Sequence, residues 1–344
     1  MTTKTTTLMR EEILSIPAVT ERFLKSSRET LAAAGAKLRE KNPPFLASIA
    51  RGSSDHVCSF LKYSSELTAG VPVASLGPSV ASIYGVTLKL AEAATLSISQ
   101  SGKSPDIVSM TRAASESGAL TIAITNVINS DLANASDFPI DILAGPERSV
   151  AATKSFVNSA VAGLALIGHW TEDKKLLTAI DALPDALAKA VECDWSPFAG
   201  ALKDENSLFV LGRGPSLAIS NEVALKFKET SGVHAESYSG AEVMHGPKAI
   251  VGKGFPVLVL AARDAAEDSL VEAANRLAEQ GAAVFLTSSK PSKATALPFV
   301  ATSHPLTDPL ALLVSFYAFV EGFARSRGLN PDEPPHLRKV TETI

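Results

Sequence analysis

The chain has few cysteines, a small net charge and no long apolar run, and each of these absences excludes a class of protein. Its 344 residues contain two cysteines, Cys58 and Cys193, far apart and without metal-ligand spacing. A net charge of −4 argues against a nucleic-acid-binding surface. The longest apolar stretch, residues 310–320, is too short for a membrane span and contains Ser315 and Tyr317. We expect a cytoplasmic protein that binds neither nucleic acid nor membrane.

Motifs for several common ligands are also missing. Residues 1–7 are polar and lack the apolar core of a secretory signal. Residues 212–214 read Gly-Arg-Gly, without the third glycine of a dinucleotide-binding loop. Four histidines have no mutual metal-ligand spacing: His56, His169, His234 and His304. We therefore expect neither a metal ion nor an organic cofactor.

Short apolar runs alternate with segments of helix length along the chain. Two N-terminal helices, separated by Pro17, are followed by apolar runs at 45–50, 71–74, 94–99, 120–125 and 138–143. This alternation predicts an α/β fold with parallel sheets covered by helices on both faces. Ligands of such sheets bind at the carboxyl ends of the strands, where loops meet helix N-termini.

The pattern occurs twice. Residues 50–54 (Ala-Arg-Gly-Ser-Ser) resemble residues 212–216 (Gly-Arg-Gly-Pro-Ser), and Gly70-Val71 resembles Gly232-Val233, in both cases 162 residues further on. A fixed offset between separated pairs indicates a duplicated domain. We predict N-terminal helices (1–40), a first α/β domain (41–175), a second (176–327) and a C-terminal tail (328–344).

A serine-rich loop follows the third apolar run. Residues 99–104 read Ser-Gln-Ser-Gly-Lys-Ser and precede a predicted helix that starts near Asp106. Short hydroxyls, a glycine and the free N–H groups of a helix N-terminus make an anion site. The same residues also fit an ordinary turn in which Ser104 caps the helix, so both interpretations stay open.

Three charged residues share one face of a predicted helix. Glu222, Lys226 and Glu229 recur at helical spacing, which by itself favours a solvent-exposed face with paired charges. Gly232 is expected to end this helix. A polar loop, residues 238–247, then contains His245.

The segment 222–250 resembles the catalytic segment of the isomerase half of glucosamine-6-phosphate synthase, a sugar-isomerase (SIS) family. The match comprises Glu-x-x-x-Lys-x-Lys-Glu, His-Ala-Glu and His-Gly-Pro, and the resemblance covers nearly all the chain from Met9. It implies two tandem SIS domains, each a parallel sheet flanked by helices in a flavodoxin-like three-layer sandwich. It also implies an obligate homodimer in which His245 enters the active site of the neighbouring subunit.

The resemblance further implies which residues form the site. The serine loop resembles the Ser-x-Ser-Gly-x-(Ser/Thr) phosphate loop of SIS domains, with Lys103 solvated, and Ala152 stands where the synthase has serine. The tail ends in Pro-x-x-Leu-x-Lys, as in the synthase. The implied substrate-binding residues are Ser53, Ser54, Ser99, Gln100, Ser101, Ser104, Val150 and Ala152. The implied catalytic residues are Glu222, Lys226, Glu229, His245 and Lys339.

The implied chemistry is aldose–ketose isomerisation of an amino-sugar phosphate with loss of ammonia. The synthase begins with a glutaminase domain whose N-terminal cysteine releases ammonia, whereas this sequence has Thr2 and we expect no such domain. Stand-alone SIS-type glucosamine-6-phosphate deaminases resemble the chain in layout and in the ending at 334–343. We expect such a deaminase, which converts a hexosamine 6-phosphate to fructose 6-phosphate.

In the expected mechanism, His245 opens the sugar ring and Glu229 moves a proton from C2 to C1. Lys226 and Glu222 position the sugar hydroxyls and tune Glu229, while Lys339 contacts the carbonyl oxygen or forms a transient Schiff base. A fructosamine-phosphate deglycase or another phosphosugar isomerase would use the same groups. A non-catalytic sugar-phosphate sensor would keep the serine loop and lose the acid–base groups. The sequence does not distinguish gluco from galacto epimers.

Overall fold

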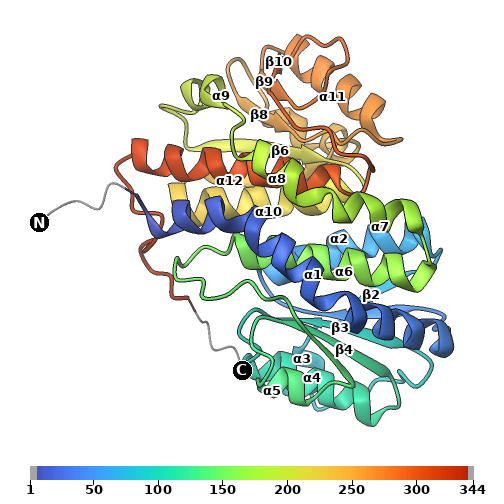
Figure 1. Cartoon of the computed structure of the whole chain (residues 1–344). Coiled ribbons are helices and arrows are strands. Elements are labelled where there is room, and N and C mark those ends of the chain that lie inside the picture. Colours follow the sequence, from blue (N-terminus) through green and yellow to red (C-terminus); the bar gives the residue numbers. More distant parts are fainter. Residues whose placement is uncertain (1–5, 340–344) are drawn as a thin grey trace, which may run out of the picture. The chain divides into compact units, whose positions relative to one another are not determined.

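Two compact units make up the protein, each built on a five-stranded parallel sheet (Figure 1). A computed structural model describes residues 6–339. The serine-loop unit contains the described residues of 18–147, 154–181 and 338–344. The glutamate unit contains those of 1–17, 148–153 and 182–337. Each unit is described by itself below.

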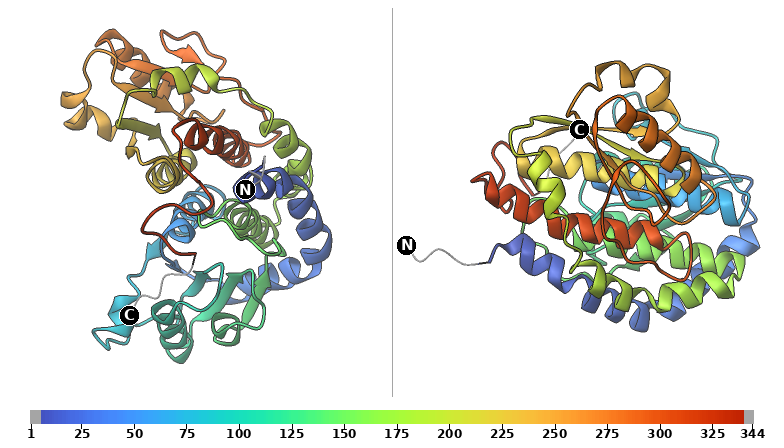
Figure 2. Two further views of the ribbon diagram at one scale, coloured as in Figure 1. Left: turned by 90° about the vertical axis from the view of Figure 1, so that its left-hand side faces the viewer. Right: turned by 90° about the horizontal axis from the view of Figure 1, so that it is seen from above.

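The sheet of the serine-loop unit has the strand order β2-β1-β3-β4-β5. Its strands are β1 (Leu46–Ile49), β2 (Val73–Ser75), β3 (Ala94–Ile98), β4 (Leu120–Thr125) and β5 (Phe138–Asp141). Helices α2 (Ser53–Thr68) and α6 (Lys154–Thr171) cover one face, and α3 (Ser79–Ser82), α4 (Pro105–Glu116) and α5 (Asp131–Asn134) the other (Figures 1 and 2). Helix α7 (Lys174–Asp181) follows α6.

The sheet of the glutamate unit has the corresponding order β7-β6-β8-β9-β10. Its strands are β6 (Ser207–Gly212), β7 (His234–Ser239), β8 (Pro256–Val259), β9 (Ala283–Leu286) and β10 (Thr295–Ala296). Helices α10 (Pro215–Ser231) and α12 (Asp308–Ser326) lie on one face and α11 (Glu267–Glu279) on the other (Figure 1). The remaining elements are α8 (Leu183–Ala190), α9 (Ser196–Ala201) and the 3₁₀ turns η1 (Glu242–His245) and η2 (Pro247–Ile250).

The two sheets repeat one backbone design, which confirms the predicted tandem α/β folds. Gly52 and Gly214, just before α2 and α10, have φ angles of 53° and 59°. Gly70 and Gly232, after the ends of the same helices, have φ angles of 68° and 62°. Glycine adopts positive φ without steric cost. The glycines that repeat at an offset of 162 residues therefore stand where the turns before and after α2 and α10 need positive φ.

Two local predictions were wrong. The two expected N-terminal helices form a single helix, α1 (Leu8–Lys41), with Pro17 inside it. Proline removes only one helical N–H, and buried apolar residues such as Ile13, Ile16 and Phe23 hold the helix on both sides of it. The loop expected at 238–247 is shorter, because β7 continues to Ser239 and η1 follows.

The orientation of α10 follows from its aromatic packing. Phe227 is fully buried and lies 5.1 Å from Phe316 and 6.2 Å from Phe323 of α12, measured between ring centroids. Such contacts fix the rotation of α10 about its axis. They also bring the adjoining face of α10, which carries Glu222 and Lys226, within reach of α12.

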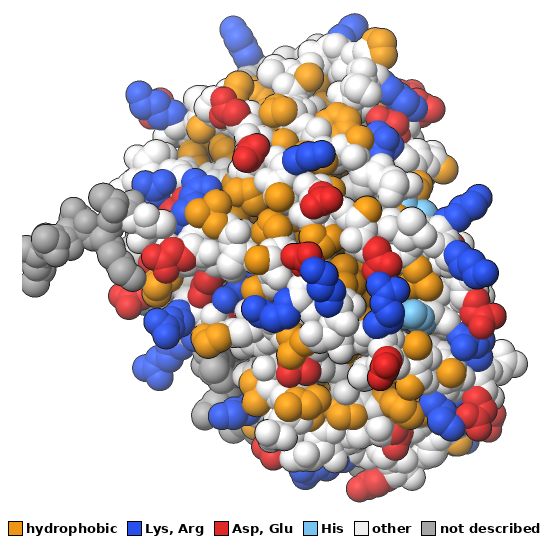
Figure 3. Space-filling model, viewed as in Figure 1, with side chains coloured by type: hydrophobic (Ala, Val, Ile, Leu, Met, Phe, Trp, Pro, Cys, Tyr) orange, Lys and Arg blue, Asp and Glu red, His pale blue; other side chains and the backbone are white. Residues whose placement is uncertain are grey.

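The surface carries charges of both signs. Figure 3 shows lysine and arginine side chains interspersed with aspartate and glutamate on the face that it presents. Within residues 6–339, no helix combines the length and apolar composition that a membrane span requires. The same residues contain no group of three or more histidine, cysteine or acidic side chains placed to hold a metal ion.

Candidate active site

The serine loop, residues 99–104, joins β3 to the N-terminus of α4. Ser99 Oγ accepts a hydrogen bond from the Gly102 N–H (3.2 Å), which curls the loop back on itself. Gly102 has a φ of 63°, and a Cβ at this position would lie 2.1 Å from Ser130 Oγ. Only glycine fits such a position, so the close turn depends on Gly102. The hydroxyl of Ser101 accepts a hydrogen bond from the Lys103 N–H (3.3 Å).

Polar groups gather where this loop meets α4. Ser104 occupies the N-cap position, but its side chain makes no capping hydrogen bond with the helix. Arg51, in the turn after β1, donates from Nε to the buried Asp106 Oδ2 in the first turn of α4 (3.0 Å). Ser53 and Ser54 begin α2 directly after that turn. Hydroxyls, helix N-termini and a guanidinium group at one sheet edge can hold a phosphate.

Asn126, which the sequence analysis did not single out, links the serine loop to the loop after β5. Its N–H donates to the Gln100 carbonyl (3.1 Å) and its side-chain amide donates to the Gly145 carbonyl (2.8 Å). Its Oδ1 accepts from the Ala144 N–H (2.9 Å). The carboxyl ends of β3, β4 and β5 are therefore joined by one residue, through its backbone N–H and its side chain. The sequence feature that could have pointed to Asn126 is its position directly after β4, at the carboxyl end of a strand.

The tail lysine binds a buried carboxylate in the serine-loop unit. Lys339 Nζ lies 2.9 Å from Glu147 Oε2, and the Glu147 side chain has no exposed surface. Glu147 also accepts from the Ser155 N–H (3.0 Å) and Oγ (2.6 Å). Burial alone would raise the pKa of Glu147, but the charge of Lys339 and these hydrogen bonds hold it below its ordinary value. The end of the tail, residues 340–344, lies outside the described residues.

The charged face of α10 is buried, so the interpretation of a solvent-exposed face was wrong. Lys226 Nζ lies 3.3 Å from Glu222 Oε1 and also pairs with Glu229. Tyr317 of α12 donates to Glu222 Oε1 (3.2 Å) and helps to cover this face. Burial alone would lower the pKa of Lys226, but the carboxylates of Glu222 and Glu229 outweigh it and raise the pKa.

Of these three side chains, only Glu229 reaches solvent. Its side chain is 21% exposed, whereas those of Glu222 and Lys226 are 0% exposed. Glu229 lines a cavity of about 370 Å³, which the end of α10 forms with Leu329, Pro335 and Leu337. A carboxylate on the edge of an apolar cavity, next to a fixed ammonium group, is suited to moving a proton.

His245 lies elsewhere in the glutamate unit. It ends η1, is exposed, and lines a separate cavity of about 400 Å³ together with Asn221, Ser239 and Glu242. This cavity and that of Glu229 share no lining residue. Within one glutamate unit the structure therefore does not bring His245 and Glu229 together.

Val150 and Ala152 lie in the segment that precedes α6. The Ser149 hydroxyl and the Arg148 N–H donate to the Glu12 carboxylate of α1, and the Val150 N–H donates to the Asp332 carbonyl (3.1 Å). Because these backbone groups are engaged outside a helix, α6 begins only at Lys154. This segment and the α10 carboxylates belong to the glutamate unit, whereas the serine loop belongs to the other unit.

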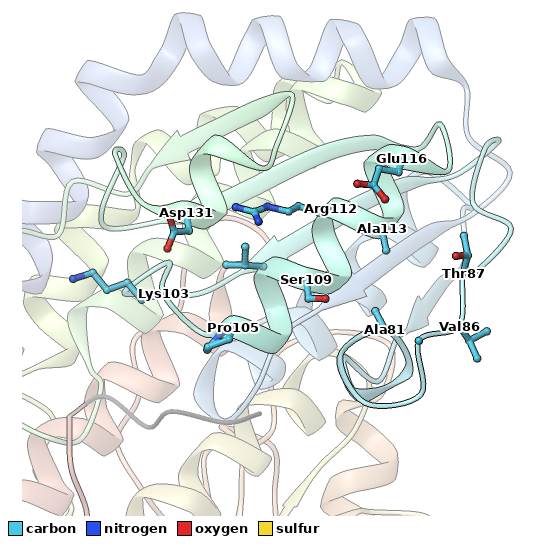
Figure 4. Close-up of a pocket in the computed structure, with 12 residues that line it drawn as sticks. Ala81, Val86, Thr87, Lys103, Pro105, Ser109, Arg112, Ala113, Glu116 and Asp131 are labelled. Atoms are coloured by element: carbon cyan, nitrogen blue, oxygen red, sulfur yellow. The ribbon is translucent and has the colours of Figure 1, made fainter.

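A further cavity of about 540 Å³ runs along the outer face of α4 (Figure 4). Lys103, Arg112 and Asp131 lie toward one end of it and Glu116 toward the other. Lys103 is exposed, as expected for a solvated residue. Two positive and two negative side chains in an open groove show no preference for an anionic ligand, so we do not include this cavity in the candidate site.

Comparisons with known proteins identify the family of the chain. The model of a family described as the SIS domain matches residues 37–168 and 201–307. The isomerizing glutamine–fructose-6-phosphate aminotransferase of Sulfurisphaera tokodaii is 34% identical over 309 residues, 87% of this chain and 50% of that protein. The one of Aquifex aeolicus is 30% identical over 348 residues, 96% of this chain and 57% of that protein. The chain spans about half the length of these curated relatives.

Solved structures share the two-sheet fold. A protein of Silicibacter pomeroyi DSS-3, provisionally assigned as a phosphosugar isomerase, is 55% identical with a TM-score of 0.93, covering 95% of this chain and all of that one. Glucosamine-6-phosphate deaminase of Thermotoga maritima is 21% identical with a TM-score of 0.76, covering 98% of this chain and all of that one. At that identity the second likeness shows the fold alone.

Proposed function

Because the chain belongs to the SIS-domain family of phosphosugar isomerases, we propose that it is a glucosamine-6-phosphate deaminase. The observation that carries the proposal is Glu229, whose partly exposed carboxylate pairs with a buried lysine and which lines a cavity. The curated relatives are named for the transfer of an amino group to fructose 6-phosphate and for isomerisation. The reverse conversion, from the amino sugar to the ketose fructose 6-phosphate, releases ammonia.

The serine loop would hold the phosphate and so anchor the sugar. Ser101, Ser104 and the N-terminus of α4 supply donors for the phosphate oxygens, in line with the lack of a capping bond from Ser104. The further substrate-binding residues of the proposal are Ser53, Ser54, Ser99, Gln100, Val150 and Ala152.

The reaction proceeds by proton transfer. His245 donates a proton to the ring oxygen, the bond from C1 to that oxygen breaks, and the C1 hydroxyl gives up its proton to solvent, which leaves the open-chain aldehyde. Glu229 removes the proton from C2, and the electron pair forms a C1–C2 double bond while the carbonyl oxygen takes up a proton. Glu229 then returns the proton to C1, which leaves an iminium at C2. Water adds at C2 and ammonia departs, so that hexosamine 6-phosphate and water yield fructose 6-phosphate and ammonia.

Glu222 and Lys226 act through Glu229 rather than on the sugar. Their side chains have no exposed surface, and Lys226 pairs with both carboxylates. We assign them as positioning residues that hold the Glu229 carboxylate at the edge of its cavity and fix the charge beside it.

The separation of His245 from Glu229 supports a homodimer with shared active sites. His245 is exposed and lines a cavity that has no residue in common with that of Glu229. In a two-fold dimer, an exposed histidine of one subunit can complete the site of the other.

The test is an ammonia-release screen over hexosamine 6-phosphates of both epimers and over phosphorylated fructosamines. We expect ammonia and fructose 6-phosphate from a hexosamine 6-phosphate, and no turnover with Glu229→Gln. Release of an amine from the fructosamine phosphates alone would identify a deglycase instead. Binding of the sugar phosphates without any turnover would identify a sensor.

A further inference from the structure

The ion pair between Glu147 and Lys339 gives the buried carboxylate a role in the proposed reaction. We propose that Glu147 is the positioning residue of Lys339, which it holds where its Nζ can donate to the sugar carbonyl oxygen. This inference rests on the proposed function, because that function brings a sugar carbonyl to Lys339.

The Glu147 carboxylate is held on several sides. It accepts from the Ser155 N–H (3.0 Å) and Oγ (2.6 Å), and from Lys339 Nζ (2.9 Å). Its side chain has no exposed surface, whereas that of Lys339 is 24% exposed. A buried carboxylate is strongly unfavourable without a neutralising charge, and Lys339 supplies that charge. Lys339 is bound to Glu147, and the exposed part of its side chain is accessible to a substrate.

The backbone around Glu147 is equally fixed. Lys154 Nζ donates to the Pro146 carbonyl (2.7 Å), and the Asn126 side chain donates to the Gly145 carbonyl (2.8 Å). The Asn126 N–H also donates to Gln100 in the serine loop (3.1 Å). A chain of hydrogen bonds thus sets the position of Lys339 relative to the proposed phosphate site. A sugar phosphate has a fixed length, so a donor at a set distance from the phosphate can meet its carbonyl.

The geometry leaves Lys339 able to serve both partners. A lysine side chain carries three N–H donors. One of them binds Glu147 Oε2 (2.9 Å), so another can donate to the sugar carbonyl oxygen. A donor placed there stabilises the charge that develops on this oxygen as Glu229 removes the C2 proton.

Kinetics of single and double variants test the positioning role. Glu147→Gln keeps the shape and removes the charge, and we expect it to lower kcat by about 10²–10³, as loss of one such donor does. KM should change by less than about threefold, since the serine loop holds the phosphate. In a Lys339→Met background, Glu147→Gln should cause no further loss. Losses that multiply independently would overturn the proposal. The exposed tail residue Glu333, changed to glutamine, is the matched control.

A chemical readout completes the test. Without any substrate, acetic anhydride should acetylate Lys339 more slowly in the wild type than in Glu147→Gln, and equal rates would overturn the proposal. This readout separates failure of the present proposal from failure of the deaminase assignment. If Glu147→Gln does not fold, Glu147→Asp, which keeps the charge, is compared with Lys339→Arg in the same kinetics. A lower kcat at unchanged KM in both variants supports the proposal. A higher KM at unchanged kcat overturns it.

Discussion

The ammonium group of Lys226 lies 3.3 Å from the carboxylate of Glu222, and neither side chain has any exposed surface. Two charges removed from water stabilise each other only as a pair, and removal of one partner leaves the other uncompensated. The pair therefore links the proposed catalytic helix to the stability of the glutamate unit.

Replacement of Lys226 by methionine should destabilise the protein severely. It leaves the carboxylates of Glu222 and Glu229 without their cation, and we expect the free energy of unfolding to fall by about 3–5 kcal/mol. Lys228→Met, an exposed lysine on the same helix, should change it by less than about 0.5 kcal/mol. Urea denaturation measures both. Equal stability of the two variants would mean that the buried pair does not form.

Removal of two hydroxyls from the serine loop should weaken binding of the sugar phosphate while the fold is retained. For Ser101→Ala with Ser104→Ala, each lost hydrogen bond to a charged group corresponds to roughly 1.5–3 kcal/mol. Isothermal titration calorimetry measures the change, and Ser115→Ala, later in α4, is the control. If the double variant binds as tightly as the wild type, the loop does not hold the phosphate.

Gly102 should tolerate no side chain. In Gly102→Ala the new Cβ meets Ser130 at a φ of 63°, whereas Gly85, with a φ of 61°, has no atom within 4 Å of that position. Both substitutions carry the left-handed backbone cost of about 1–2 kcal/mol. The clash should add about 1–3 kcal/mol for Gly102→Ala alone. Thermal unfolding compares them, and indistinguishable midpoints would contradict the close approach of Gly102 to Ser130.

Acid should remove the stabilisation that Glu147 provides. The pKa of this carboxyl in the folded protein lies below its ordinary value of 4.5, because Lys339 and Ser155 outweigh burial. Its contribution is therefore complete above about pH 4.5 and is lost as the pH falls through the folded value. The difference in unfolding free energy between wild type and Glu147→Gln should be constant near neutral pH and shrink below pH 4.5. If the difference in unfolding free energy grows in acid, the pKa of Glu147 is raised in the folded protein and the assigned direction is wrong.

Several features could be predicted because they depend on local chemistry. The glycines at 52, 70, 214 and 232 mark turns that require positive φ, so a repeat in sequence became a repeat in backbone. The serine loop was recognisable from its position between a strand and a helix. Sequence spacing also placed Glu222, Lys226 and Glu229 on one helical face.

Other features depend on contacts between distant residues. Glu147 and Lys339 are 192 positions apart, and no periodicity links them. The burial of Lys226 follows from packing of α10 against α12, where Tyr317 meets Glu222, so a charged stripe that looks exposed in sequence lies inside. Pro17 stays within α1 because buried apolar side chains on both sides hold the helix.

A mixture of two inactive variants tests the shared active site. Glu229→Gln and His245→Ala would each be inactive as homodimers, but a mixed dimer would contain one site with both groups intact. Random exchange makes half of the dimers mixed, so activity should recover to about a quarter of the wild-type value. Mass spectrometry confirms the exchange. Confirmed exchange without recovered activity would mean that His245 serves its own subunit.

Turnover of hexosamine 6-phosphate labelled with deuterium at C2 tests the central claim most directly. We predict equimolar ammonia and fructose 6-phosphate, a slower reaction than with unlabelled substrate, and loss of both products in Glu229→Gln. The reason is that Glu229 must break the bond from C2 to hydrogen before ammonia can leave. Ammonia released with the label still at C2, or an undiminished rate in Glu229→Gln, would contradict the account.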